Sequence, residues 1–124
     1  MKLRVNKKRF IYLISPNNIK KNFYLDLEKV LNENLVEFFQ LRLKNVNKEK
    51  LIYVGKKVKK ICKKYNVKFI INDSPYIAKA LGSDGCHLGQ SDLNILSARK
   101  LIKNKIIGIT CHNSKTLIKI AIKN

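Results

Sequence analysis

Residues 67–88, with the sequence VKFIINDSPYIAKALGSDGCHL, decide the fold that we expect for this chain. The apolar run Val67–Ile71 predicts a buried strand, and Gly85–Leu88 is a second run of the same kind. Between them, Ser74-Pro75 is a typical helix start, with serine at the N-cap and proline at the first helical position, and Tyr76–Leu81 continues that helix. A strand, a helix and a strand in this order predict a parallel βαβ unit.

The same alternation extends in both directions from this segment. Further strands are expected at Phe10–Ile14, Val36–Leu43 and Ile106–Thr110, with helices at Asn22–Leu31, Asn47–Tyr65 and Leu93–Ile102 and from Asn113 or Ser114 to the end. Ser91 and Asp92 are the expected caps of the helix at Leu93–Ile102. Five βα units predict an α/β fold with a parallel sheet. Two architectures fit this pattern, a doubly wound open sheet and part of a (β/α)8 barrel.

Length and composition suit one domain over residues 1–124, with 45% hydrophobic residues. No run of apolar residues is long enough to span a membrane. The basic start Met1–Arg9 is not followed by the apolar core of a signal peptide. The three cysteines, Cys62, Cys86 and Cys111, form no CxxC pair and favour a reducing compartment. We therefore expect a cytoplasmic protein without a membrane partner.

The formal net charge of +19 has two interpretations. A surplus of lysine and arginine is typical of proteins that bind nucleic acids or anionic surfaces. Here, however, lysine greatly exceeds arginine, whereas base recognition relies on arginine, and no basic motif interleaved with aromatic residues is present. A general drift in composition toward lysine and asparagine explains the charge better, so no specific nucleic-acid partner is expected.

The predicted second strand carries an unusual row of polar side chains. Gln40, Arg42 and Lys44 alternate with Leu41 and Leu43, so the three polar residues share one face of a strand. Strands of a parallel sheet are normally apolar on both faces, and buried cations need an anion to compensate them. The row therefore indicates an anion site at the C-terminal end of the strand. An exposed edge strand with one wet face is the alternative.

Two carboxylates follow predicted strands. Asp73 comes directly after Ile71-Asn72, and Asp92 lies shortly after the strand Gly85–Leu88. Both would lie at the same edge of a parallel sheet, and two carboxylates beside a phosphate are what Mg²⁺ uses. Helix capping is the alternative explanation for each aspartate, and it is compatible with metal binding.

The dipeptides Cys86-His87 and Cys111-His112 suggest a zinc site only weakly. Neighbouring residues in a strand point to opposite faces, so one pair cannot easily chelate one ion. Buried free thiols are the favoured interpretation.

Read together, these segments resemble the thiamine-phosphate synthases and their thiazole-tautomerase relatives. The matching segments are Tyr12–Ile14, Gln40–Lys44, Ile71–Asp73, Asp84–Asp92 and Ile107–His112, in the order and with the spacing of the family. The resemblance implies a (β/α)8 barrel. It also implies the joining of hydroxymethylpyrimidine pyrophosphate to a thiazole phosphate, with release of pyrophosphate. In that reaction the pyrophosphate leaves first, and the thiazole nitrogen captures the pyrimidine cation.

The resemblance also implies roles for individual residues. Asp73 and Asp92 would hold Mg²⁺, and Arg42 and Lys44 would act catalytically by neutralising the departing pyrophosphate. The expected substrate-binding residues are Gln40, Arg42, Lys44, Asn72 and Thr110, of which Thr110 occupies a position that is commonly serine in the family. His87 and His112 would line the mouth without an assigned role.

Alternatives remain at this point. The paired aspartates favour the synthase over the tautomerase, and a non-enzymatic remnant or phosphate-ligand-binding module is a further alternative. Family members have about 200 residues or more, as a full barrel requires. From the length of this chain we expect an incomplete barrel without the thiazole-phosphate site. Such a chain should be marginally stable, prone to self-association and weak or inactive as a synthase alone.

Overall fold

The computed structural model describes residues 9–124, so most of the basic segment Met1–Arg9 lies outside the described residues. The strands are β1 (Ile11–Ile14), β2 (Val36–Leu41), β3 (Lys68–Asn72), β4 (Gly85–Leu88) and β5 (Ile106–Ile109). The helices are α1 (Phe23–Leu31), α2 (Lys48–Lys64), α3 (Pro75–Leu81), α4 (Ile95–Ile102) and α5 (Lys115–Lys123). Strands and helices alternate throughout, which confirms the five predicted βα units.

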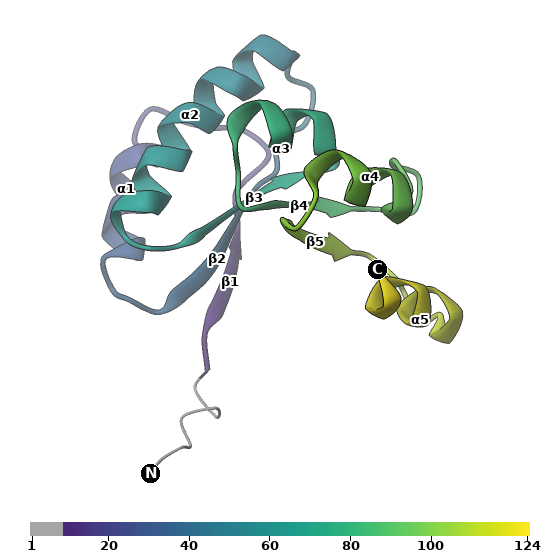
Figure 1. Cartoon of the computed structure of the whole chain (residues 1–124). Helices are drawn as coiled ribbons and strands as arrows, with labels where there is room; N and C mark the ends of the chain where they lie inside the picture. The colour runs from purple at the N-terminus through teal and green to yellow at the C-terminus, as the bar shows by residue number, and fades with distance from the viewer. Residues whose placement is uncertain (1–8) are drawn as a thin grey trace.

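The five strands form one parallel sheet whose spatial order is β1-β2-β3-β4-β5. Helices α1 to α4 lie on the same side of this sheet, and α5 lies beyond β5 (Figure 1). A doubly wound sheet reverses its strand order at a switch point and carries helices on both faces. The sequential order with helices on one side is instead the arrangement of a barrel wall. It confirms the partial (β/α)8 barrel and excludes the doubly wound sheet.

The core lies between the sheet and these helices. Alternate strand residues point toward the helices, among them Phe39, Phe69 and Cys86, each at most 1% exposed. They pack against apolar residues of the helices, such as Val58 of α2 and Ala98 of α4. This helix-covered face fixes the register of every strand, because a shift of one residue would expose its apolar set.

The opposite face of the sheet has no helix over it among residues 9–124 (Figure 1). Tyr12 and Ile14 on this face are 43% and 48% exposed, and the Tyr12 ring stacks on Phe38 with centroids 5.4 Å apart. Gln40 and His87 point to the same side. Because side chains alternate along a strand, the polar residues that lie between the core residues of the strands point to this face. No helix within the described residues has the length and apolar character needed to cross a membrane.

Two predicted boundaries are wrong by two residues, whereas the other differences between predicted and observed strand ends are of one residue. The second strand was expected to continue to Leu43, but β2 ends at Leu41, and the chain beyond it turns toward the loop after β1. The fourth helix was expected to begin at Leu93 with Ser91 and Asp92 as caps, but α4 begins at Ile95. Its cap is Asn94, whose side-chain oxygen accepts a hydrogen bond from the Ser97 amide at 2.9 Å.

Candidate active site

A cleft of about 410 Å³ lies at the C-terminal edge of the sheet, on the face without helices. It is lined by Tyr12, Ile14, Gln40, Arg42, Lys44, Asn72, Asp73, His87, Gly89 and Thr110. These residues come from all five strands or from the turns that follow them, which is where barrels of this kind place their ligands. The cleft brings together every residue that was predicted to bind substrate or metal except Asp92, which follows Gly89 by three residues.

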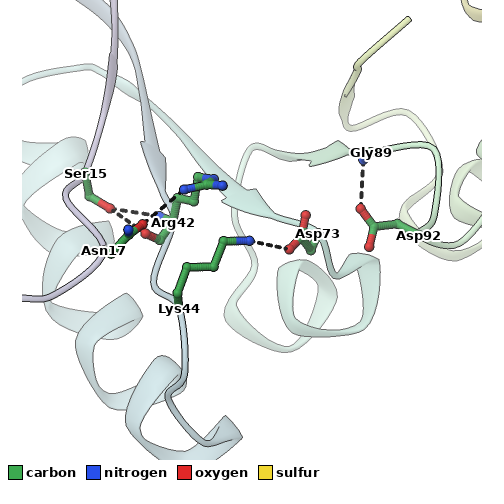
Figure 2. A network of polar contacts seen from close by, with 7 residues as sticks. All are labelled: Ser15, Asn17, Arg42, Lys44, Asp73, Gly89 and Asp92. Carbon is green, nitrogen blue, oxygen red and sulfur yellow. Dashed lines mark hydrogen bonds and ion pairs between the residues drawn. The ribbon is translucent and has the colours of Figure 1, made fainter. Parts of the chain in front are cut away.

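The loop after β1 holds Arg42 in place. The Arg42 amide donates a hydrogen bond of 2.8 Å to Oγ of Ser15, which is 7% exposed, and the Ser15 hydroxyl lies 3.4 Å from the Arg42 carbonyl. The guanidinium in turn donates to Oδ1 of Asn17 at 3.0 Å (Figure 2). Arg42 lies past the end of β2, so the Ser15 side chain replaces the missing strand partner. Ser15 and Asn17 were not predicted as site residues, although their place directly after a strand was a signal for them.

Lys44 and Asp73 form an ion pair across the cleft, with Nζ of Lys44 3.5 Å from Oδ2 of Asp73 (Figure 2). The Lys44 amide also donates to the Asn17 carbonyl at 3.3 Å. Because β2 is flanked by β1 and β3, the alternative of an exposed edge strand is excluded. Gln40, Arg42 and Lys44 therefore lie at the C-terminal edge of the sheet, with the Asp73 carboxylate opposite Lys44.

Asp73 has an unusual backbone conformation, with a φ of 71° in the left-handed region. Its amide donates to the His87 carbonyl at 2.7 Å, and the Ser74 amide donates to the Asn72 carbonyl at 2.9 Å. Five other non-glycine residues among the described ones also have a positive φ, and aspartate adopts this region more readily than most residues, so the conformation orients Asp73 but does not by itself mark a site. The cap of α3 is Ser74, whose Oγ accepts from the Ile77 amide at 3.2 Å. Capping therefore does not explain the Asp73 carboxylate.

Asp92 is held by a short turn rather than by a helix. Its Oδ2 accepts a hydrogen bond of 2.7 Å from the Gly89 amide (Figure 2). Asn94 takes the capping role at α4, so the Asp92 carboxylate is not a helix cap either. Neither aspartate therefore serves as a helix cap.

The two carboxylates influence each other. Burial raises the pKa of Asp73 above the ordinary value, the nearby charge of Asp92 raises it further, and Lys44 opposes both effects. Bringing two ionised carboxylates together is unfavourable unless a cation compensates them. Carboxylate oxygens are ligands that Mg²⁺ prefers, and it keeps its other positions for water and substrate oxygens. The carboxylate oxygens of Asp73 and Asp92 are therefore donors of the kind that would fit a magnesium ion.

His87 lies across the open face of the sheet between β3 and β5. Its Nε2 is 2.9 Å from Oγ1 of Thr110, and burial lowers its pKa while Asp73 and Asp92 oppose that shift. The ring fits because residue 108 is glycine: a Cβ there would lie 2.6 Å from Nδ1 of His87. Cys86 points the other way, into the core, as expected for neighbours in a strand.

Gln40 is a polar side chain inside the sheet and only 3% exposed. Its Nε2 donates a hydrogen bond of 3.1 Å to the Tyr12 hydroxyl, which fixes the orientation of its amide. His112, which was expected at the mouth, is exposed in the loop after β5 and is not among the residues that line the cleft. The tyrosine partner of Gln40 was quoted in the resemblance but was not predicted to contact it.

Comparisons with known proteins bear on this geometry. The family model described as thiamine monophosphate synthase matches residues 11–124. The chain belongs to this family.

Individual proteins that are similar to this chain carry names of the same family. The thiamine-phosphate synthase of Pelagibacter ubique is 57% identical over 122 residues, which cover 98% of this chain and 58% of that protein. That of Fusobacterium nucleatum is 42% identical over 106 residues, or 83% of this chain and 51% of that protein. A solved structure, the thiamine phosphate pyrophosphorylase from Pyrococcus furiosus, superposes with a TM-score of 0.81 at 25% identity, over 97% of this chain and 58% of that one. The chain thus spans little more than half the length of these members of the thiamine monophosphate synthase family.

Proposed function

We propose that this chain supplies the metal and pyrophosphate site of a thiamine-phosphate synthase. The reaction is a transferase reaction that joins hydroxymethylpyrimidine pyrophosphate to thiazole phosphate and yields thiamine phosphate and pyrophosphate. The observation that carries this proposal is the cleft at the C-terminal edge of the sheet, which gathers Arg42 and the Lys44–Asp73 ion pair. Asp92 lies close enough for its charge to raise the pKa of Asp73. We expect the substrates to be small molecules and the reaction to take place in the cytoplasm.

Arg42 and Lys44 suit the departing pyrophosphate. A guanidinium presents several donors in a rigid fork that matches phosphate oxygens, and an ammonium adds a compact charge. Arg42 is held by Ser15 and Asn17 before any ligand binds, so little reorganisation is needed. Such fixed cations stabilise charge where it develops in the transition state. We assign them the neutralisation of the pyrophosphate as its bond to the pyrimidine methylene breaks.

Asp73 and Asp92 would hold the magnesium ion. When bound, it would supply positive charge to the pyrophosphate oxygens. The surroundings of Asp73 support this assignment: burial first, and then the charge of Asp92, raise its pKa, and a bound cation would favour both ionised carboxylates. Gly89 would orient the Asp92 carboxylate through its amide.

Polar groups deeper in the cleft are assigned to the pyrimidine and to the inner end of the pyrophosphate. Gln40, Asn72 and Thr110 present amide and hydroxyl groups there, and all three line the same cleft. The Gln40 amide nitrogen is already bonded to Tyr12, which leaves its oxygen as an acceptor for a ligand donor. A pyrimidine that carries an amino group offers such a donor.

The relatives described above carry synthase or pyrophosphorylase names, which does not favour the tautomerase or the non-enzymatic alternatives. The remnant alternative makes a different prediction from the synthase. A remnant would lack activity that depends on both Mg²⁺ and the aspartates.

The test is a Mg²⁺-dependent assay of thiamine phosphate formation on this chain, beside the Asp92→Ala and Asp26→Ala variants. Asp26 is exposed in the first turn of α1 and serves as a matched control. Because the chain spans little more than half of its relatives, we expect weak product formation at most; that product should require Mg²⁺, disappear in Asp92→Ala and persist in Asp26→Ala. Product formation that is unchanged by Asp92→Ala would contradict the proposed site, and absence of product would contradict activity of the chain by itself.

A further inference from the structure

A second polar cleft lies at the other end of the sheet. It has a volume of about 270 Å³ and is lined by Lys59, Cys62, Lys63, Asn66, Val67, Lys68, Phe69, Gly82 and Asp84. These residues come from the end of α2, the start of β3 and the turn between α3 and β4. The cleft is therefore separated from the candidate active site by the length of β3, whose other end carries Asn72 and Asp73.

Three lysines and a single carboxylate line this cleft. Among residues 9–124 the ion pairs are Lys44 with Asp73 and Lys64 with Glu28, so none of the three lysines is paired with a carboxylate there. A neighbouring cleft of about 190 Å³, on the other side of the turn at residues 82–85, is lined by three more lysines, Lys79, Lys103 and Lys105. The end of the sheet that contains both clefts thus carries a local excess of positive charge.

The one carboxylate of the cleft is already used by the fold. Oδ2 of Asp84 accepts a hydrogen bond of 2.7 Å from the Phe69 amide, and the Asp84 amide donates to the Phe69 carbonyl at 2.8 Å. Asp84 therefore joins the starts of β3 and β4, and its negative charge offsets only one of the three lysines. Lys59 is held in place as well, since its Nζ donates to the Leu81 carbonyl at 2.9 Å. An ammonium has three donors, so two remain for a ligand.

We propose that this cleft binds a compact phosphate-bearing anion, with Lys59, Lys63 and Lys68 as its cationic ligands and Asn66 as an amide donor. Charge complementarity carries the choice of ligand, because three unpaired cations around a small polar hollow attract a multiply charged anion. The volume of about 270 Å³ suits a short inorganic polyphosphate rather than a drug-sized molecule. The site is distinct from the one assigned to the substrate pyrophosphate and does not depend on that assignment.

Lysine footprinting with inorganic tripolyphosphate as the probe tests this proposal. Acetylation of each lysine is followed by mass spectrometry, with and without the probe, at about 0.1 M salt, where long-range charge effects are screened. At a probe concentration of about twice its dissociation constant, we expect the acetylation rates of Lys59, Lys63 and Lys68 to fall about threefold. Lys56 and Lys60, exposed on α2, should not change. Because each lysine is read separately, binding of the probe beside Lys44 does not interfere.

Two double variants with equal loss of charge provide the control. Lys63→Gln/Lys68→Gln should weaken tripolyphosphate binding about tenfold and abolish the protection of Lys59, whereas Lys56→Gln/Lys60→Gln should leave both unchanged. If the two double variants lost tripolyphosphate binding equally, binding would depend on net charge alone, and the proposal would be overturned. Uniform protection of all lysines, or protection by a single-stranded RNA but not by tripolyphosphate, would overturn it as well.

Discussion

The Nζ atom of Lys44 lies 3.5 Å from Oδ2 of Asp73, so the polar row that follows β2 meets the carboxylate that follows β3 (Figure 2). The pair is partly exposed, with 41% and 47% of the two side chains accessible, and surface pairs of this kind contribute little to stability. Its importance lies in its position, because it places a cation and a carboxylate together at the edge of the sheet where we propose the pyrophosphate and metal site.

The Ser15 hydroxyl should matter for both stability and ligand binding. Ser15→Ala leaves the Arg42 amide without its side-chain acceptor, and we expect a loss of about 1–3 kcal/mol in the free energy of unfolding, measured with urea. Pyrophosphate binding should weaken as well, because the position of Arg42 is less restricted. Ser15→Thr keeps the hydroxyl and should recover most of both properties. A threonine variant no better than alanine would contradict this role.

Gly108 and His87 should be energetically coupled. Gly108→Ala places a Cβ 2.6 Å from Nδ1 of His87, which must move and lose its contact with Thr110. We expect a destabilisation of about 1–3 kcal/mol, as for other overpacked sites. In a His87→Ala background the same glycine substitution should cost much less. A double-mutant cycle from urea unfolding measures this, and strict additivity would contradict the contact.

Glu28 should make stability depend on pH in the acid range. Hydrogen bonds from Lys64 first, and then from Tyr65, lower the pKa of the Glu28 carboxyl below the ordinary value of 4.5. Its stabilising contribution is therefore complete above pH 4.5 and is lost as the pH falls through the lowered pKa. Glu28→Gln should lower the thermal midpoint slightly at neutral pH and not at strongly acid pH. Glu37, which is exposed on β2, provides the control variant Glu37→Gln. If the thermal midpoint of Glu28→Gln stayed below that of the wild type at strongly acid pH, the predicted direction of the pH dependence would be wrong.

Much of the fold was predictable because it depends on local patterns. The apolar runs Val67–Ile71 and Gly85–Leu88, with a serine and a proline between them, predict a strand, a helix and a strand without an alternative. The sequential order of the strands was not predictable from these patterns, since doubly wound sheets share the alternation. The end of β2 at Leu41 was missed because the polar alternation continues into the loop after the strand hydrogen bonds stop.

The site was predictable to the extent that parallel strands bring their C-terminal ends together. Asp73 and Asp92 could be placed at one edge from their positions after strands. The cap of α3 at Ser74 was predicted and is confirmed, whereas the cap of α4 at Asn94, in place of Ser91 or Asp92, was not predicted because it depends on backbone angles over a few residues. The support of Arg42 by Ser15 joins residues 27 positions apart, which sequence spacing alone does not indicate.

The central claim is that Arg42, Lys44, Asp73 and Asp92 together bind Mg²⁺ and pyrophosphate. Titration calorimetry of inorganic pyrophosphate into this chain, with and without Mg²⁺ and beside Asp92→Asn and Asp26→Asn, tests it most directly. We expect binding that strengthens with Mg²⁺ and falls at least about 10–100-fold in Asp92→Asn, with Asp26→Asn unchanged. Binding of equal strength with and without Mg²⁺, or binding unaffected by Asp92→Asn, would contradict the account.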